Sequence, residues 1–168
     1  MYDQFKPGNV DNGRVWYALN QQTPNLQVAF LGLFVAALAT FEGFYIEGSL
    51  AQRNNNPGNL RPIGASTGFR YFETPLDGWE ALRKQILINV GRGLTLDEFF
   101  KGKPGVYPGY SPVADNSEEV IENYLNFMAS KLSIPRNVPL WTYMPSLVDV
   151  TGSSVLIQGI FYGYKFNQ

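Results

Sequence analysis

One stretch of the chain is far more apolar than the rest and sets the first constraint on the fold. Residues 28–41 read VAFLGLFVAALATF, and none of these side chains is charged. A helix of this length spans about 21 Å, which is shorter than the roughly 30 Å hydrocarbon core of a membrane. Because the stretch is apolar on all sides, we predict a helix buried at the centre of a core rather than a membrane span.

Charge and two missing residue types narrow the chemistry. The 168 residues include 13 basic and 14 acidic side chains, for a net charge of −1, so we expect no nucleic-acid partner. Histidine and cysteine are absent, which excludes Ser-His-Asp and Cys-His hydrolysis and zinc held by His or Cys. No calcium-loop spacing is present, and we expect neither a metal nor a cofactor. An enzyme with this sequence would use Asp, Glu, Lys or Tyr as acid and base.

The remaining pattern predicts an α+β fold that is mainly α. Helix-capping residues stand at positions 74, 95 and 117, and the first two have an acid three residues later, as in a capping box. The last of these segments carries an apolar stripe at helical spacing up to Leu132. Residues 60–63 and 69–72 are typical of two short strands around glycines, which predicts a small β-hairpin.

The chain divides into three parts without a linker. Residues 1–25 are expected to form an irregular N-terminal arm, in which we see no signal peptide. Residues 26–140 form the main domain, and residues 141–168 a C-terminal segment that packs on the same domain. Within it, Trp141, Tyr143 and Met144 suggest a short packed turn. The aromatic run at residues 155–164 could complete the core or dock to a partner.

Glu42 is the acid that the sequence places best for proton donation. It ends the apolar stretch and lies between Phe41 and Phe44, with one glycine intervening. Apolar neighbours and the negative end of a helix dipole both disfavour the ionised carboxyl, so we expect a raised pKa. The alternative is a solvated acid at a helix end. Glu47 is the nearest rival, and Glu73 could face the same cleft.

An asparagine-rich turn is the most unusual local feature. Residues 54–59 read NNNPGN, and their amides could bind sugar hydroxyls and N-acetyl groups. The alternative is a turn whose side chains satisfy only its own backbone. Sugar rings could lie on aromatic faces supplied by Tyr71, Phe72, Tyr107 and Tyr110.

Several of these motifs together carry a resemblance. EGF at residues 42–44, QRNNNPGNLR at 52–61 and FxTPxxGWxAL at 72–82 are the main ones, supported by GLTL at 93–96 and YSPVADN at 110–116. Over residues 28–140 the chain resembles the lysozyme-like lytic transglycosylases, in particular those of phage virions and bacterial peptidoglycan-degrading proteins. It departs from better-known members in having Gly43 where a serine often follows the glutamate, and it lacks their glutamine-bearing hairpin signature.

The resemblance implies a lysozyme-like catalytic domain at residues 26–140, with a small β-hairpin flanking a cleft. Glu42 matches the catalytic acid, Asn59 falls on the turn that lines the cleft, and Tyr124 matches a tyrosine that faces the site. We therefore expect the Tyr124 hydroxyl within one water of Glu42. Tyr110 and Phe72 are the further substrate-binding residues that we predict.

The implied function is cleavage of the β-1,4 bond between N-acetylmuramic acid and N-acetylglucosamine in peptidoglycan. A single glutamate acts as acid and then as base in a transglycosylase, whereas a lysozyme needs a second carboxylate, for which Asp77 and Glu73 are possible. The expected location is the cell envelope or a virion, with a protein partner there bound through the C-terminal segment. The alternatives are a catalytically silent lysozyme-like module for structure or cell-wall binding, and a cell-wall peptidase, which would lack a nucleophile or metal here.

Overall fold

Helices dominate the part of the chain that the structure, a computed structural model, describes: residues 24–65, 67–111, 116–145 and 147–148. In chain order they are α2 (Pro24–Phe41), α3 (Leu50–Arg53), α4 (Pro75–Gly91), α5 (Leu96–Lys101), α6 (Glu118–Leu132) and the 3-10 helix η2 (Leu140–Tyr143). Within these residues there is no β-strand, only two isolated bridges, Thr95 with Pro139 and Lys103 with Tyr107. The predicted mainly α character is confirmed.

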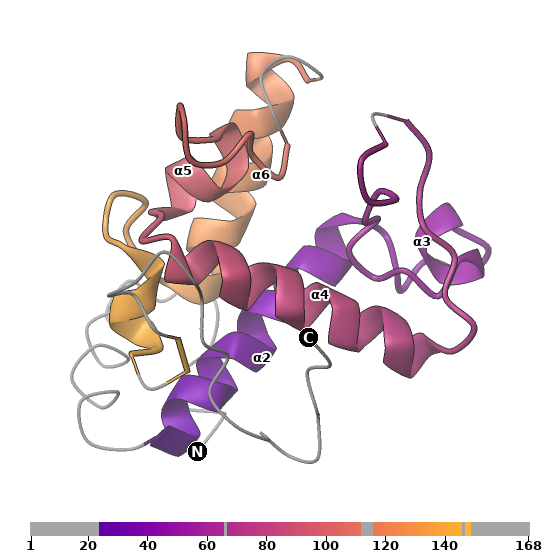
Figure 1. Ribbon diagram of the computed structural model, residues 1–168, viewed down its shortest axis with the longest axis horizontal. Coiled ribbons are helices and arrows are strands. Elements are labelled where there is room, and N and C mark those ends of the chain that lie inside the picture. Colours follow the sequence, from indigo (N-terminus) through magenta and orange to yellow (C-terminus); the bar gives the residue numbers. More distant parts are fainter. Residues whose placement is uncertain (1–23, 66, 112–115, 146, 149–168) are drawn as a thin grey trace.

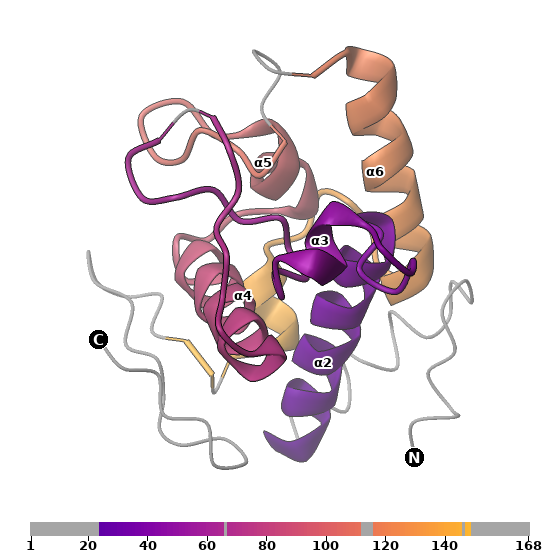
Figure 2. The same ribbon diagram turned by 90° about the vertical axis from the view of Figure 1, so that its right-hand side faces the viewer.

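The apolar helix α2 lies at the centre of the core, as predicted. Phe30, Phe34 and Leu38 on it are completely buried. Figure 2 shows α2 with α4 on one side and α6 on the other, and it packs against both. In Figure 1 it runs across the molecule and ends near α3. None of the described helices is long and apolar enough to cross a membrane.

The helix starts are encoded locally, and the three predicted caps are confirmed. Thr74 accepts a hydrogen bond from the backbone N–H of Asp77, and the Asp77 carboxylate accepts from Thr74 in return, which completes a capping box at α4. Thr95 and Glu98 form the same box at α5. Ser117 caps α6 through the N–H of Val120. Each cap satisfies a backbone donor that the first helical turn leaves unpaired.

The predicted β-hairpin at residues 60–63 and 69–72 is not confirmed, because the described residues there form a loop with no strand. One backbone hydrogen bond, from Arg70 N to Leu60 O at 2.8 Å, joins its two sides. The side chain of Asn56 takes the place of a strand partner. Its amide donates to the carbonyl oxygens of Leu60 and Arg70, and its Oδ1 accepts from the Leu60 N–H.

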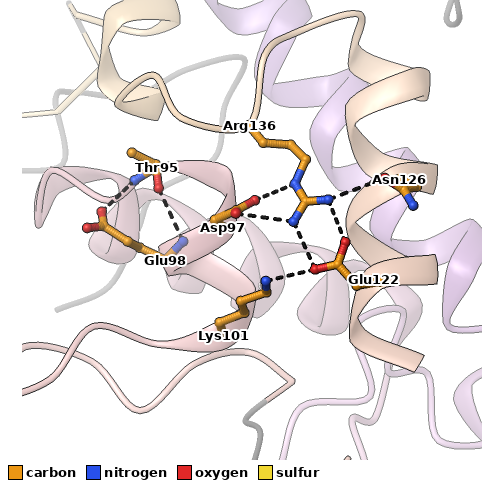
Figure 3. Close-up of polar contacts among 7 residues, drawn as sticks. All are labelled: Thr95, Asp97, Glu98, Lys101, Glu122, Asn126 and Arg136. Carbon is orange, nitrogen blue, oxygen red and sulfur yellow. Dashed lines mark hydrogen bonds and ion pairs between the residues drawn. The ribbon is translucent and has the colours of Figure 1, made fainter. Parts of the chain in front are cut away.

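Arg136, which follows α6 in the chain, links this helix to α5. Arg136 binds the Asp97 carboxylate of α5 through Nε and Nη2, at 2.5 and 3.1 Å. It binds Glu122 of α6 through Nη1 and Nη2, at 2.7 and 3.1 Å, and Lys101 also pairs with Glu122 at 2.7 Å. Figure 3 shows this cluster, with the guanidinium between the two helices. The hydrogen bonds from Arg136 and Lys101 lower the pKa of Glu122 to about 2.

The last described residues lie in the core. Leu140 and Tyr143 of η2 are buried, and Tyr143 stacks on Phe30 of α2 with ring centroids 5.0 Å apart. Met144, Leu147 and Val148 are buried in the same core. The short packed turn predicted there is confirmed. The predictions for residues 1–23 and 155–164 lie outside the described residues.

Candidate functional site

Glu42 stands where the central helix stops. Its backbone N–H still donates to Leu38 O, while Gly43 has a φ of 76° and ends the helix. Gly43 donates to Thr40 O and Phe44 to Ala39 O, which is the Schellman pattern of helix termination. Only glycine adopts this left-handed backbone without a steric cost, so the Glu-Gly pair places the Glu42 side chain at the helix end.

Two neutral donors hold the carboxyl of Glu42, one on each oxygen. The Tyr124 hydroxyl from α6 donates to Oε1 at 2.7 Å. The Asn59 side-chain amide donates to Oε2 at 2.9 Å and lies 3.4 Å from the Glu42 carbonyl oxygen. The structure therefore brings together three of the five predicted site residues. The contact with Tyr124 is direct, which confirms the prediction that its hydroxyl lies within one water of Glu42.

Burial decides the acidity of this carboxyl. Desolvation raises the pKa of Glu42, and the hydrogen bonds from Asn59 and Tyr124 lower it by less, so the net pKa is raised. This is the direction that the sequence predicts. Burial also raises the pKa of Tyr124 well above its usual value, so its hydroxyl stays protonated and acts as a donor. Its ring stacks on Phe41, with centroids 3.7 Å apart.

The asparagines of the turn have two different roles: two of them bind backbone groups, and one binds Glu42. Asn55 donates to the carbonyl oxygens of Phe72 and Glu73. Asn56 makes hydrogen bonds to the backbone of the loop that follows. These two match the alternative of a turn that satisfies backbone groups. Asn59 does not, because its amide binds Glu42. Its Oδ1 is buried and has no hydrogen-bond partner among the described residues, so an unsatisfied acceptor lies beside the contact with Glu42.

The other two predicted substrate-binding residues do not touch Glu42. Tyr110 donates its hydroxyl to Gly58 O, and its ring packs between the aromatic side chains of α5 and Tyr124. Phe72 is buried, with 8% of its surface exposed, and the guanidinium of Arg70 lies over its ring at 4.5 Å. Their contact with substrate stays a prediction.

Sequence reasoning named Phe41 and Phe44 as apolar neighbours of the acid, but it missed how their rings group with Tyr45 and Trp79. Phe41 packs on Tyr124, and Phe44 and Tyr45 form an aromatic group with Trp79 of α4. Tyr45 is 60% exposed. The signal was present, because Phe41, Phe44 and Tyr45 surround Glu42-Gly43 in the sequence, but local order does not show which ring faces solvent.

The acids considered as partners of Glu42, Asp77 and Glu73, and the rival Glu47 all lie on the exposed surface. Asp77 is exposed and its carboxylate is engaged in the α4 capping box. Glu47 and Glu73 are exposed. No group of three or more acidic, His or Cys side chains in the described part of the chain is arranged to hold a metal ion.

A scan against protein-family models and searches of curated proteins and of solved structures gave no match to this chain. The chemistry of the site therefore has to be argued from its own residues. These are a desolvated carboxyl, two neutral donors on its two oxygens, and a buried acceptor without a partner beside it.

Proposed function

We propose that the Glu42 carboxyl is the single acid and base of a lytic transglycosylase, which cleaves the β-1,4 bond between N-acetylmuramic acid and N-acetylglucosamine in peptidoglycan. The observation that carries the proposal is the carboxyl itself, buried enough to raise its pKa and held by a neutral donor on each oxygen. A raised pKa keeps such a carboxyl protonated to higher pH than an exposed glutamate, and the two hydrogen bonds stabilise it once it has lost the proton.

In the first step the protonated Glu42 gives its proton to the glycosidic oxygen. The bond from this oxygen to C1 of the muramyl residue breaks, and the ring becomes oxocarbenium-like. N-acetylglucosamine leaves with a free 4-hydroxyl group. The carboxylate that remains accepts hydrogen bonds from Tyr124 and Asn59, which stabilise its new charge.

In the second step the same carboxylate acts as base. It takes the proton of the muramyl 6-hydroxyl group while that oxygen bonds to C1, which closes a 1,6-anhydro ring. Glu42 is protonated again, and no water is consumed. The two steps need one carboxyl whose protonated and ionised forms are close in free energy. Opposing effects on the pKa of Glu42, burial against two hydrogen bonds, favour that balance.

The surroundings of the other acids favour transglycosylation over a two-carboxylate mechanism. A retaining glycosidase needs a second carboxylate about 5 Å from the acid. Asp77 is instead committed to capping α4. The acid at the end of a central helix, an asparagine turn against it and a tyrosine from a later helix are also consistent with the lysozyme-like arrangement that we propose for residues 26–140.

The partner that follows from this proposal is peptidoglycan, and the place of action is the cell envelope or a virion. The unpartnered Oδ1 of Asn59 supports a ligand that offers an N–H or O–H donor beside the acid. Such donors are abundant on an N-acetylated glycan strand.

Mass spectrometry of the soluble products from purified peptidoglycan tests the proposal. We expect anhydro-muropeptides, each lighter by one water than the corresponding hydrolysis product. Glu42→Gln serves as the control and should release none above background. Reducing muropeptides would show a lysozyme instead, and no release by the wild-type protein would favour the silent module.

A further inference from the structure

A partly buried tyrosine connects the aromatic core to the turn that carries Asn59. The Tyr110 hydroxyl donates a hydrogen bond to the carbonyl oxygen of Gly58, which is 52 positions earlier in the chain. We propose that Tyr110 is a positioning residue, which acts through the peptide bond between Gly58 and Asn59 to hold the Asn59 amide against the carboxyl of Glu42. Its importance for turnover rests on the proposed function, whereas its effect on Glu42 does not.

The peptide unit between Gly58 and Asn59 is held at both of its polar ends. Its carbonyl oxygen accepts from Tyr110, and its N–H donates to Asn56 O at 3.0 Å. A planar peptide with both ends bonded cannot rotate without losing one of these hydrogen bonds. Because this unit also fixes where the Asn59 side chain starts, its orientation controls the 2.9 Å contact from Nδ2 to Oε2 of Glu42.

Tyr110 itself is fixed from the other side. Its backbone N–H donates to Phe99 O at 2.8 Å. Its ring stacks on Phe99 with centroids 5.5 Å apart and meets the rings of Phe100 and Tyr124 edge-on at 5.8 and 6.4 Å. A side chain packed in this way has little rotameric freedom, so its hydroxyl is a fixed point for the turn.

The turn fits against Tyr110 only because residue 58 is glycine. A Cβ atom there would lie 2.6 Å from Leu82 Cδ1 and 2.7 Å from the Tyr110 hydroxyl oxygen. The turn is thus pressed between α4 and Tyr110. The contacts form a ring: Tyr110 holds Gly58, Asn59 holds Glu42, and Tyr124, which touches Glu42, packs on Tyr110.

Titration of the Glu42 carboxyl in the free protein, followed by carbon-13 NMR of its side chain, tests this role without substrate. The titratable groups that interact with Glu42 are Tyr124 from α6 and Tyr110 after α5, and both have raised pKa values and stay neutral. The hydrogen bond from Asn59 lowers the pKa of Glu42. Tyr110→Phe loosens the turn and should therefore shift this pKa upward.

The matched control is Tyr107→Phe, which removes a tyrosine hydroxyl from the same loop. Tyr107 interacts with Gln85 and Asn89 rather than with the turn, so the Glu42 titration should not move. Gly58→Ala disturbs the same contact from the opposite side and should reproduce the upward shift. It also keeps the test decisive should Tyr110→Phe fold poorly.

The path through Asn59 is tested in a double-mutant cycle. In an Asn59→Gly background, Tyr110→Phe should cause no further shift of the Glu42 titration. An unchanged titration in Tyr110→Phe and Gly58→Ala, an equal shift in Tyr107→Phe, or a full shift in the Asn59→Gly background would each overturn the proposal.

Activity separates this inference from the proposed function. If the wild-type protein releases muropeptides, Tyr110→Phe should lower kcat about 5- to 20-fold with little change in KM, the equivalent of one weakened hydrogen bond. A shifted titration without any muropeptide release by the wild type supports the positioning role and refutes the transglycosylase. Muropeptide release by the wild type together with an unshifted Glu42 titration in Tyr110→Phe supports the transglycosylase and refutes the positioning role.

Discussion

The hydroxyl of Tyr124 donates a hydrogen bond of 2.7 Å to Oε1 of Glu42, although 82 positions separate the two residues in the chain. The contact joins the end of α2 to the buried face of α6, the helix against which α2 packs. A phenol hydroxyl in this place stabilises the ionised carboxyl. Its position is fixed, because the Tyr124 ring is stacked on Phe41.

Tyr124→Phe keeps this ring and removes only the donor. The pKa of Glu42 should rise further, since one of the two hydrogen bonds that lower it is lost. The pH–rate profile on peptidoglycan should move to higher pH, and kcat should fall about 5- to 20-fold. If rate and profile both stay as in the wild type, Tyr124 contributes only packing.

Glu42→Gln removes the transferable proton at nearly constant volume. Muropeptide release should fall at least about 10²–10⁴-fold, the usual contribution of general acid–base catalysis. Thermal unfolding should show equal or slightly higher stability, because a desolvated acid is replaced by a neutral amide. The new amide can also pair with Asn59, whose unpartnered Oδ1 can turn towards it.

Glu47→Gln and Glu73→Gln are the controls for this substitution. Both side chains are exposed, so their activity should stay within about twofold of the wild type, since isolated surface substitutions are usually mild. Full activity in Glu42→Gln would move the search for the acid to Glu47.

Asn59→Gly separates the site from the turn. Asn59 has a φ of 46°, in the left-handed region that glycine tolerates, so this variant deletes the amide without the strain that alanine would add. Muropeptide release should fall roughly 10-fold or more, as expected for a lost hydrogen bond to a charged group, while the melting temperature changes little. Asn59→Ala should lose activity as well as some stability.

Asn55→Gly is the matched control, because Asn55 has a φ of 49° and lies in the same turn. Its amide binds the backbone of residues 72 and 73 rather than Glu42. This variant should unfold at a lower temperature and leave the Glu42 titration in place. The opposite pattern, with stability lost in Asn59→Gly and activity lost only in Asn55→Gly, would contradict our division of the turn.

Glu122→Gln should make the folded state less stable in a pH-dependent way. Hydrogen bonds from Arg136 and Lys101 lower the pKa of Glu122 from its ordinary value of 4.5 to about 2. A group with a lowered folded-state pKa stabilises the fold above its unfolded pKa and loses that contribution as the pH falls through the folded value. The difference in melting temperature between wild type and variant should therefore reach its largest value above about pH 5 and shrink as the pH falls towards 2.

Glu119→Gln, on the exposed face of the same helix, is the reference for this series. It removes a charge outside the Arg136 cluster, so it controls for the change in net charge. A gap between wild type and Glu122→Gln that persists unchanged to pH 2 would show that the ion pairs are not its cause.

Much of the fold could be predicted from the sequence because its signals are local. The capping boxes at Thr74 and Thr95 involve residues three positions apart, so the starts of α4 and α5 need no distant partner. The apolar run of α2 has no polar face to expose, so burial at the centre was its only stable outcome. Glu42 followed by Gly43 likewise placed an acid at the end of that helix.

The loop at residues 60–72 shows where local signals fail. Its residues favour strands, but Asn56 occupies the backbone groups that a strand ladder would use. Which of the three consecutive asparagines binds these backbone groups depends on where the loop folds back, and the sequence does not show this. The same limit applied to Tyr110, because its hydroxyl bonds to the carbonyl oxygen of Gly58, 52 positions away, and no local pattern indicates this contact.

The sequence by itself determined the helices, the central place of α2 and the acid at its end, since periodicity, capping and burial are properties of neighbouring residues. Only the tertiary structure decided what surrounds that acid. The donors on its two oxygens come from 17 and 82 positions away. Their meeting depends on how α2, α6 and the asparagine turn pack, and the pKa of Glu42 follows from the desolvation and hydrogen bonds that this packing creates.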